Sequence, residues 1–354
     1  MTIAASGDVL VHQRVVDSAR AHDDGFGYAF GPLSQAIEAI DGPSIVLVNL
    51  ETPLTQAYIS PLNANPPVLG APPELAKALV TTGIDVVSVA NNHAMDQTVN
   101  GLADTVQTSR DAGLGVVGAG HGRDEAYQPW ITEQGGLRVG YLGFAGHVNA
   151  GPGGRTEDQM QVALLRHEED ALAAITRLRA QVDVVVVAAH WSHDFVTTPL
   201  ASQRSLARRM VDAGADLILG TGPHVLQQVE RLESPRGQAL VAYSLGNLIS
   251  NQGLRYQPGH RIRADEHPVA ITPGTRDAVL LAAKISSPEA GRVEIESVEA
   301  TVFWVENNFW ERRLSDEVPV DIHLSRLRDV DEALRTERLA AVGETLGSAV
   351  VLVP

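Results

Sequence analysis

One pattern recurs along the chain and constrains its fold: an apolar run of strand length, a polar residue at its end, and then a helix-like stretch. The segment Ile84–His93, IDVVSVANNH, shows this pattern most fully. Alternation of such runs with helices is typical of an α/β fold with buried strands. Open α/β sheets bind ligands at the carboxyl ends of their strands, so Asn91, Asn92 and His93 are candidate site residues. The alternative is that Asn91–Asn92 is ordinary turn chemistry and that His93 begins a helix.

The same pattern occurs in other strand-like runs of the sequence. These runs are Thr2–Val11, Ser44–Leu50, Val182–His190 and Ala215–Gly220. Because the carboxyl ends of parallel strands meet at one edge, we expect their polar tips to converge on one edge of a single sheet. The tips are Asp8, Asn49 or Glu51, Asn92 with His93, His190 and His224. Carboxylate, amide and imidazole groups together are typical of a divalent-metal hydrolase site.

Helix-like stretches separate these strands in the first two thirds of the chain. Helices are expected over Gln13–Ala21, Pro32–Ile40, Glu74–Thr82, Gly101–Ala112, Glu168–Gln181 and Ser202–Ala213, with one more near Val330–Leu346. Past His224 the apolar residues alternate without intervening helices, which predicts a largely antiparallel second half.

Composition excludes several kinds of site and partner. The formal charge of −16 argues against nucleic acid and anionic membrane surfaces as partners. Cysteine is absent, so any metal must be held by His, Asp, Glu, Asn or water, which suits Mn, Fe, Zn or Mg. No apolar run approaches the roughly 18 residues of a membrane span, and the N-terminus lacks an export signal. We therefore expect a cytoplasmic protein, unless an export segment was removed; the oligomeric state is left open.

Short motifs at the strand ends carry a family resemblance. They are Gly7-Asp8, Asn49-Leu50-Glu51, Ala90-Asn91-Asn92-His93 with Asp96, His190-Trp191, Gly220 to Val225, and Tyr243 to Asn247. In this order they resemble the motifs of the CapA-like poly-γ-glutamate synthesis family, within the calcineurin-like metallophosphoesterase superfamily. The resemblance implies an α/β fold: a β-sandwich flanked by helices, with a metal centre at the strand ends. It implies a catalytic domain over residues 1–310, with an irregular loop at 251–276, and a C-terminal extension, 311–354, packed on the same domain.

The resemblance implies divalent ions, two of them or one tight and one weaker, that polarise the scissile group and lower the pKa of a bound water. The implied ligands are Asp8, Glu51, Asn92, His190 and His224. His93 suits a proton donor to the leaving group, because it follows Asn92 directly and imidazole titrates at about pH 7. Asp96 lies on the same face of a helical turn and is placed to orient His93. The alternative is that Asp96 is a first-turn carboxylate favoured by the helix dipole.

Several motifs depart from the superfamily pattern, and two of these departures remove an expected histidine. Asp8 is followed by Val9 and Leu10 where the superfamily has Asp-x-His, and His12 is a candidate replacement. Gly222 stands where the superfamily motif Gly-His-x-His has its first histidine. One metal position is therefore expected to lack an imidazole, to bind its ion more weakly, and to bind it more tightly in a Gly222→His variant.

Groups that bind substrate are expected from the strand ends and from the long loop. The candidates are Asn49, Asn91, Arg255 and Arg261. Guanidinium presents a fork that matches carboxylate or phosphate, whereas solvated loop charge is the alternative for the arginines. The expected substrate is a small molecule bearing a glutamyl or phosphate group. Three hypotheses follow: a phosphoester hydrolase, a hydrolase of amide or γ-glutamyl bonds, and a non-catalytic component of poly-γ-glutamate or glutamyl-metabolite biosynthesis.

Overall fold

The computed structural model describes residues 1–354 except 62–66, 150–158, 259–267, 288–290, 316 and 354. In the described chain, a first, nine-stranded sheet has the order β16-β15-β14-β1-β2-β3-β4, with β13 beside β1 and β17 beside β15. Its strands are β1 (Thr2–Val9), β2 (Ser44–Asn49), β3 (Val86–Ser88), β4 (Gly115–Val117), β13 (Asn247–Ile249), β14 (Asp277–Ser286), β15 (Glu294–Asn307), β16 (Ile322–Arg326) and β17 (Val351–Val353).

A second, six-stranded sheet has the order β11-β12-β10-β9-β7-β6. Its strands are β6 (Trp130–Gln134), β7 (Leu137–Ala145), β9 (Val184–His190), β10 (Leu217–Thr221), β11 (Val229–Ser234) and β12 (Gly237–Ala242). A separate pair joins β5 (Ala119–His121) to β8 (Met160–Val162). The longer helices are α1 (Gln13–Arg20), α2 (Phe26–Glu38), α3 (Glu74–Thr82), α4 (Thr98–Ala112), α6 (Glu168–Arg179), α7 (Ala201–Ala213) and α10 (Glu332–Leu346). The short ones are α5 (Gly122–Ala126), α8 (Pro268–Ile271), α9 (Phe309–Leu314) and the 3₁₀ turns η1 (Pro273–Thr275) and η2 (Leu327–Asp329).

The two large sheets pack face to face, and helices cover their outer faces. In β9, Val184 and Val186 join the core between the sheets, whereas Val185 and Val187 pack with residues of α6 and α7. Helices α1 to α4 cover the outer face of the first sheet in the same way. This alternation follows from the two-residue period of a strand, which sends successive side chains to opposite faces. The predicted β-sandwich flanked by helices is confirmed.

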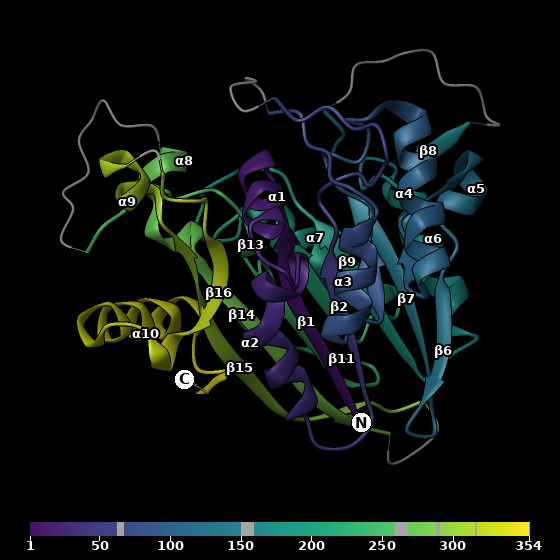
Figure 1. Ribbon diagram of the computed structural model, residues 1–354. Helices are drawn as coiled ribbons and strands as arrows, with labels where there is room; N and C mark the ends of the chain where they lie inside the picture. Colours follow the sequence, from purple (N-terminus) through teal and green to yellow (C-terminus); the bar gives the residue numbers. More distant parts are fainter. Residues whose placement is uncertain (62–66, 150–158, 259–267, 288–290, 316, 354) are drawn as a thin grey trace.

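One expectation about the strand ends is wrong: the polar tips do not belong to a single sheet. β1, β2 and β3 lie in the first sheet, whereas β9 and β10 pair in parallel in the second. Apolar runs alone cannot assign strands to one sheet or two, because every strand of a covered sandwich is buried on both faces. In Figure 1, β1 rises from the N-terminus at the lower edge to α1 at the upper end, where the carboxyl ends gather.

The second half is antiparallel only in part. β14, β15 and β16 form antiparallel pairs, but β12 pairs in parallel with β10, and β13 pairs in parallel with β1. Helix α2 begins at Phe26 rather than Pro32, because Phe26, Ala29, Phe30 and Leu33 form one buried face. The described part of the loop 251–276 contains α8 and η1.

The C-terminal segment continues the first sheet. β16 pairs with one part of β15 and β17 with another. Arg338 of α10 binds Asp277 of β14 through two hydrogen bonds, with Nε to Oδ1 at 3.0 Å and Nη2 to Oδ2 at 2.5 Å. In the described part of the chain, no helix is long and apolar enough to cross a membrane.

Candidate metal centre

Polar side chains from the strand ends of both sheets come close together. These strand ends lie at the upper end of the sandwich in Figure 1. Asp8 comes from β1, and Glu51 follows β2 after a single intervening residue. His190 is the last residue of β9. Asp8, Glu51 and His190 are buried, and each offers one ligand atom within 4.8 Å of the others. The structure therefore brings together residues that lie far apart in the sequence.

Glu51 is the most exceptional member of this cluster. Both of its carboxylate oxygens are buried, and neither has a hydrogen-bond partner in the described chain. Burial, and then the neighbouring Asp8 carboxylate, raise the pKa of Glu51 well above its usual value. A buried carboxylate without a donor is costly, and a bound cation removes that cost. The donor set of two carboxylates and nearby imidazoles fits a divalent ion.

His190 is held in the neutral form that a metal ligand requires. Burial lowers its pKa to about 3, because no nearby charge compensates fully for the lost hydration. Its Nε2 lies 2.8 Å from Asn92 Oδ1 and 3.6 Å from Glu51 Oε1. Its Nδ1 lies 3.0 Å from Thr221 Oγ1 and 3.2 Å from Asn49 Nδ2. Both ring nitrogens are thus positioned by neighbours.

His224 lies at the edge of the cluster, beyond β10. Its Nδ1 is 3.2 Å from Asp8 Oδ2, 3.0 Å from Asn247 Oδ1 and 3.9 Å from Glu51 Oε2. Burial lowers its pKa, but the bond to Asp8 and the charge of that carboxylate outweigh burial, so the net shift is upward. Its backbone is left-handed, with φ of 58°, which is uncommon outside glycine. The contact with Asp8 therefore favours the charged form of His224.

Asp8 is oriented by two donors in addition to His224. Asn49 Nδ2 donates to Oδ1 at 2.7 Å, and the Gly222 backbone N–H donates to Oδ2 at 3.3 Å. Burial raises the pKa of Asp8, but the hydrogen bond from His224, the charge of His224 and the hydrogen bond from Asn49 outweigh burial, so the net shift is downward. Asp8 is therefore ionised at neutral pH.

Gly222 cannot carry the histidine of the superfamily motif. Its φ is 104°, and an added Cβ would lie 2.2 Å from the Trp191 carbonyl oxygen. The expectation that Gly222→His tightens a metal site is wrong, because the backbone would have to move first. The position instead supplies a backbone donor to Asp8. His12 is the candidate for the histidine missing from the Asp-x-His motif. It makes no ion pair with Asp8 or Glu51 in the described chain, and it lines a neighbouring cavity.

His93 and Asp96 form a buried pair beside the cluster. His93 Nδ1 lies 2.6 Å from Asp96 Oδ2, which also accepts the Leu69 backbone N–H at 2.8 Å. The side chains of both are about 6% exposed. Asp96 precedes α4, which begins at Thr98, so it is not a first-turn carboxylate of that helix. The contact leaves Nε2 as the ring nitrogen not bonded to Asp96.

The residues predicted to bind substrate are placed differently from one another. Asn49 donates to Asp8, and Asn91 Nδ2 donates to the Leu50 carbonyl at 2.9 Å and to Asn49 Oδ1 at 3.4 Å. These amides hold the strand ends together. Arg255 is exposed and lines the same cavity as His12. Arg261 lies outside the described residues.

Thr221 and Asn247 lie within the sequence motifs, but the sequence alone assigned neither of them a role in the site. Asn247 lies opposite Asp8 in the register of β1 and β13, and its side chain contacts His224. β13 is only three residues long, which is too short for an apolar–polar alternation to predict a strand. The signal that was available is the polar residue at the end of each strand, such as Thr221, the last residue of β10.

Comparison with known proteins gives consistent matches. A family model described as bacterial capsule synthesis protein PGA_cap matches residues 2–252. Capsule biosynthesis protein CapA of Bacillus anthracis is 30% identical over 259 residues, covering 72% of this chain and 60% of that protein. PGA biosynthesis protein CapA of Bacillus subtilis (strain 168) is 28% identical over 296 residues, covering 83% of this chain and 70% of that protein.

Among solved structures, the 5'-nucleotidase precursor from Thermus thermophilus matches with a TM-score of 0.52 and 16% identity. The match covers 97% of this chain and 59% of that chain. At this identity the likeness concerns the fold alone, and it agrees with the expected β-sandwich flanked by helices.

Proposed function

From the premise that the chain belongs to the bacterial capsule synthesis protein family PGA_cap, we propose that it is a divalent-metal-dependent hydrolase of γ-glutamyl amide bonds. The observation that carries the metal-dependent part is the Glu51 carboxylate, buried among Asp8, His190 and His224 without a hydrogen-bond donor. The glutamyl part draws on the relative named as a PGA biosynthesis protein. The metal is Mn, Fe, Zn or Mg.

The ligands in this proposal are Asp8, Glu51, Asn92, His190 and His224. When bound there, a divalent ion supplies Lewis-acid polarisation of the scissile carbonyl and a lowered pKa for a water molecule. Asn49 and the Gly222 N–H fix the direction of Asp8, so that its lone pairs face the centre. A backbone N–H in place of an imidazole leaves one ion position with fewer ligands. A phosphoryl-transfer centre that clamps its substrate between two ions needs both positions, whereas carbonyl polarisation needs one.

His93 is the proton donor to the leaving amine. Asp96 accepts from Nδ1, so the proton that His93 delivers is on Nε2. The Leu69 backbone N–H donates to the same Asp96 oxygen and so helps to fix the Asp96 carboxylate. A general acid of this kind contributes about 10²- to 10⁴-fold to turnover.

Elemental analysis and turnover together test the proposal. The protein, purified without chelator, should contain a divalent metal and cleave γ-glutamyl-p-nitroanilide. His93→Ala should keep the metal and lose about 10²-fold or more in kcat, the scale expected for a general acid. His224→Ala should lose metal as well as turnover. If His93→Ala empties the centre as thoroughly as His224→Ala, His93 is a ligand and the division of roles is wrong.

The substrate panel includes the rival chemistries. Activity on bis-p-nitrophenyl phosphate without activity on the γ-glutamyl substrate would make the protein a phosphoester hydrolase. Tight metal binding with no turnover on either would favour a non-catalytic role in poly-γ-glutamate biosynthesis.

A further inference from the structure

A cavity of about 450 Å³ adjoins the His93–Asp96 pair. Leu69, whose N–H binds Asp96, is one of its walls, and His12 is another. His12 lies close enough to His93 and His224 for their charges to influence its pKa. Arg14 at the start of α1 and Phe309 at the start of α9 also line it. Both helices lie at the upper end of the sandwich in Figure 1, where the strand ends of the metal centre also lie.

The charge of this cavity is opposite to that of the protein. Its described lining includes Arg14 and Arg255 and contains no aspartate or glutamate, although the chain carries a formal charge of −16. In two other cavities, acidic side chains of the lining balance the charge of the basic ones. One combines Lys77 and Arg20 with acidic residues such as Glu74, and another combines arginines with Asp124 and Asp170. Among the described residues that line it, the cavity beside His93 therefore carries positive charge without a compensating carboxylate.

Neither arginine has an acidic partner among the described residues. Arg14 has no ion pair or hydrogen bond there, and the Arg255 guanidinium lies 5.9 Å from the centroid of the Phe309 ring. Phe309 in turn packs edge-on against Trp310. Stacking on an aromatic face restrains a guanidinium without using its hydrogen-bond donors. Both forks remain available to an oxyanion.

The rest of the lining suits a short hydrocarbon chain. Val68, Leu69 and Leu254 contribute apolar surface, together with Phe309. A ligand that fits has a planar or tetrahedral oxyanion for the arginines and methylene groups for the apolar walls. A glutamyl residue bound through its side-chain amide has this form, because a free carboxylate lies a few carbon atoms from the scissile bond.

We propose that Arg14 and Arg255 form a carboxylate-binding subsite that selects substrates with a free carboxylate beside the bond cleaved at the metal centre. This inference rests on the proposed hydrolase function for the identity of the cleaved bond. The subsite raises the affinity for the substrate through groups that do not react, so its loss affects KM rather than kcat.

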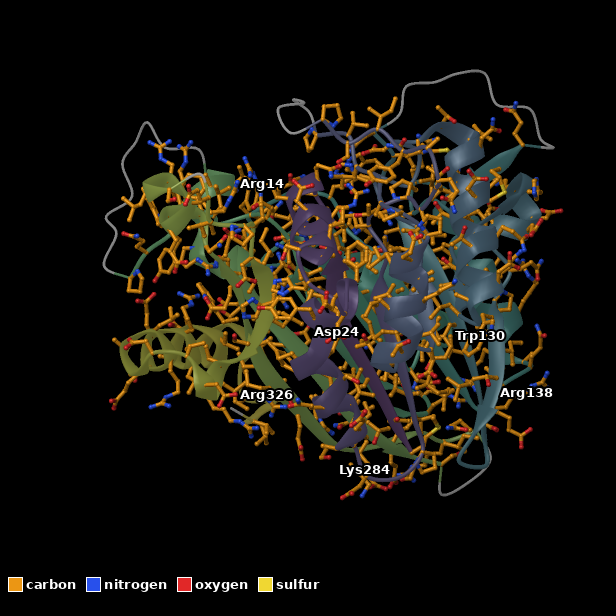
Figure 2. The ribbon with its side chains drawn as sticks, in the orientation of Figure 1. Arg14, Asp24, Trp130, Arg138, Lys284 and Arg326 are labelled. Atoms are coloured by element: carbon orange, nitrogen blue, oxygen red, sulfur yellow. The ribbon has the colours of Figure 1, made fainter. Side chains whose placement is uncertain are left out.

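A binding experiment tests the subsite without turnover. Glutarate and, separately, inorganic phosphate are titrated calorimetrically into the full-length protein, the Arg14→Gln and Arg255→Gln variants, and Arg138→Gln. Arg138, the second residue of β7, lies near the lower edge of the molecule, far from Arg14 in Figure 2, and is a matched control for charge. Glutarate affinity should fall about tenfold in each subsite variant, the effect of losing one charge-assisted hydrogen bond, and stay unchanged in Arg138→Gln.

A Glu51→Gln variant separates the subsite from the metal centre. Glutarate binding that survives in Glu51→Gln but falls in the arginine variants supports the subsite. Binding that is lost in Glu51→Gln and kept in the arginine variants would overturn it, because the anion would then sit at the metal centre. Equal losses in Arg14→Gln, Arg255→Gln and Arg138→Gln would reduce the effect to net charge and overturn it too. Tighter binding of phosphate than of glutarate, lost in the same arginine variants, would replace the carboxylate with a phosphate as the occupant.

Turnover measurements are a second test of the carboxylate-binding subsite. KM for γ-glutamyl-p-nitroanilide should rise about tenfold in each arginine variant with kcat nearly unchanged, and the α-methyl ester of the substrate should show no such rise. Glutarate binding that depends on Arg14 and Arg255, in a protein that cleaves neither substrate, would refute the hydrolase proposal and leave the anion subsite standing. An equal KM rise for the acid and its ester would refute the selection.

Discussion

Thr221 Oγ1 lies 3.0 Å from Nδ1 of His190, so it is placed to accept a proton there and leave Nε2 for a metal. Asn49 Nδ2 is a donor only, so Thr221 Oγ1 is the neighbour able to accept a proton from Nδ1. A ligand bond from Nε2 requires the proton to be on Nδ1, and the Thr221 hydroxyl supports that tautomer. This residue thus acts on the centre through His190.

We expect Thr221→Val to lower metal affinity about 10- to 100-fold, the range for loss of such an outer partner, while His190 itself stays in place. Thr105→Val is the control, because its hydroxyl is also buried but binds the backbone at Leu54 and Gly101. Both variants should lose some stability, and only Thr221→Val should lose metal affinity in a calorimetric titration. Equal metal affinities in the two variants would show that Thr221 does not influence metal binding through His190.

Metal affinity should rise with pH. The pKa of Glu51 is raised by burial and by Asp8, and that of His224 is raised because the bond to Asp8 outweighs burial. A bound ion needs the deprotonated forms of both, so protons compete with metal below these raised pKa values and the competition fades as pH rises through them. The dissociation constant should fall about tenfold per pH unit for each proton displaced.

Titrations between about pH 5.5 and pH 8, around the ordinary histidine pKa, measure this slope. Glu51→Gln should flatten it by about one proton. A slope of zero in the unmodified protein would mean that neither group gives up a proton to the ion.

The identity of the clustered residues could be predicted because each ends a strongly apolar run, as Glu51 and His190 do. The roles of Thr221 and Asn247 could not, because they depend on register: Thr221 lies opposite His190 between β9 and β10, and Asn247 opposite Asp8. Register is a property of pairs of strands, and a single strand does not encode it.

At the level of elements, the close approach of β1 to β13 builds one side of the centre. Gly7 makes this approach possible, since an added Cβ would lie 2.0 Å from the Gly246 carbonyl oxygen. The next residue in each segment, Asp8 and Asn247, then lies in register. Backbone atoms cannot yield to a methyl group as a flexible side chain can.

Gly7→Ala should therefore separate β1 from β13, cost roughly 1–3 kcal/mol of stability or more, and weaken metal binding with it. Gly31→Ala is the matched control. Gly31 lies within α2 and has no heavy atom within 4 Å of an added Cβ, so alanine there should be neutral or stabilise by up to about 1 kcal/mol. Urea unfolding of both variants measures the difference, and similar midpoints would contradict the close-approach argument.

Helices and strands were predicted best where a long periodic run determined them. α3, α6 and α7 lie within about a residue or two of their expected ends, because each has a clear buried face. The division of strands between two sheets escaped prediction. The runs in β2 and β9 are equally apolar, and only the contacts of their inner faces show that the strands oppose each other across the core.

For the whole molecule, this division means that the metal centre joins the two sheets. Asp8 and Glu51 belong to the first and His190 and His224 to the second, so an ion bound by both sets connects the halves of the sandwich. The Arg338–Asp277 pair connects α10 to β14 independently of the centre. Binding to the folded state alone must raise the free energy of unfolding.

Thermal unfolding with and without Mn²⁺ or Zn²⁺ should show this stabilisation, about 2.7 kcal/mol when the ion is at 100 times its dissociation constant. Calorimetry should resolve one tight equivalent and at most one that is weaker by about an order of magnitude or more, because Gly222 contributes an N–H and no ligand atom. Two equivalents of equal affinity would require a ligand outside the described cluster.

Glu51→Gln should reverse its effect on stability when metal is added. Without metal, Glu51 is a buried carboxyl without a donor, and glutamine removes the cost of ionising it, so the variant should unfold at the same temperature as the unmodified protein or higher. With saturating metal, the unmodified protein should be the more stable of the two, because the variant has lost a charged ligand. The crossing of the two melting temperatures is the signature of a carboxylate kept for a cation. A variant that is less stable under both conditions would show that Glu51 serves the fold instead.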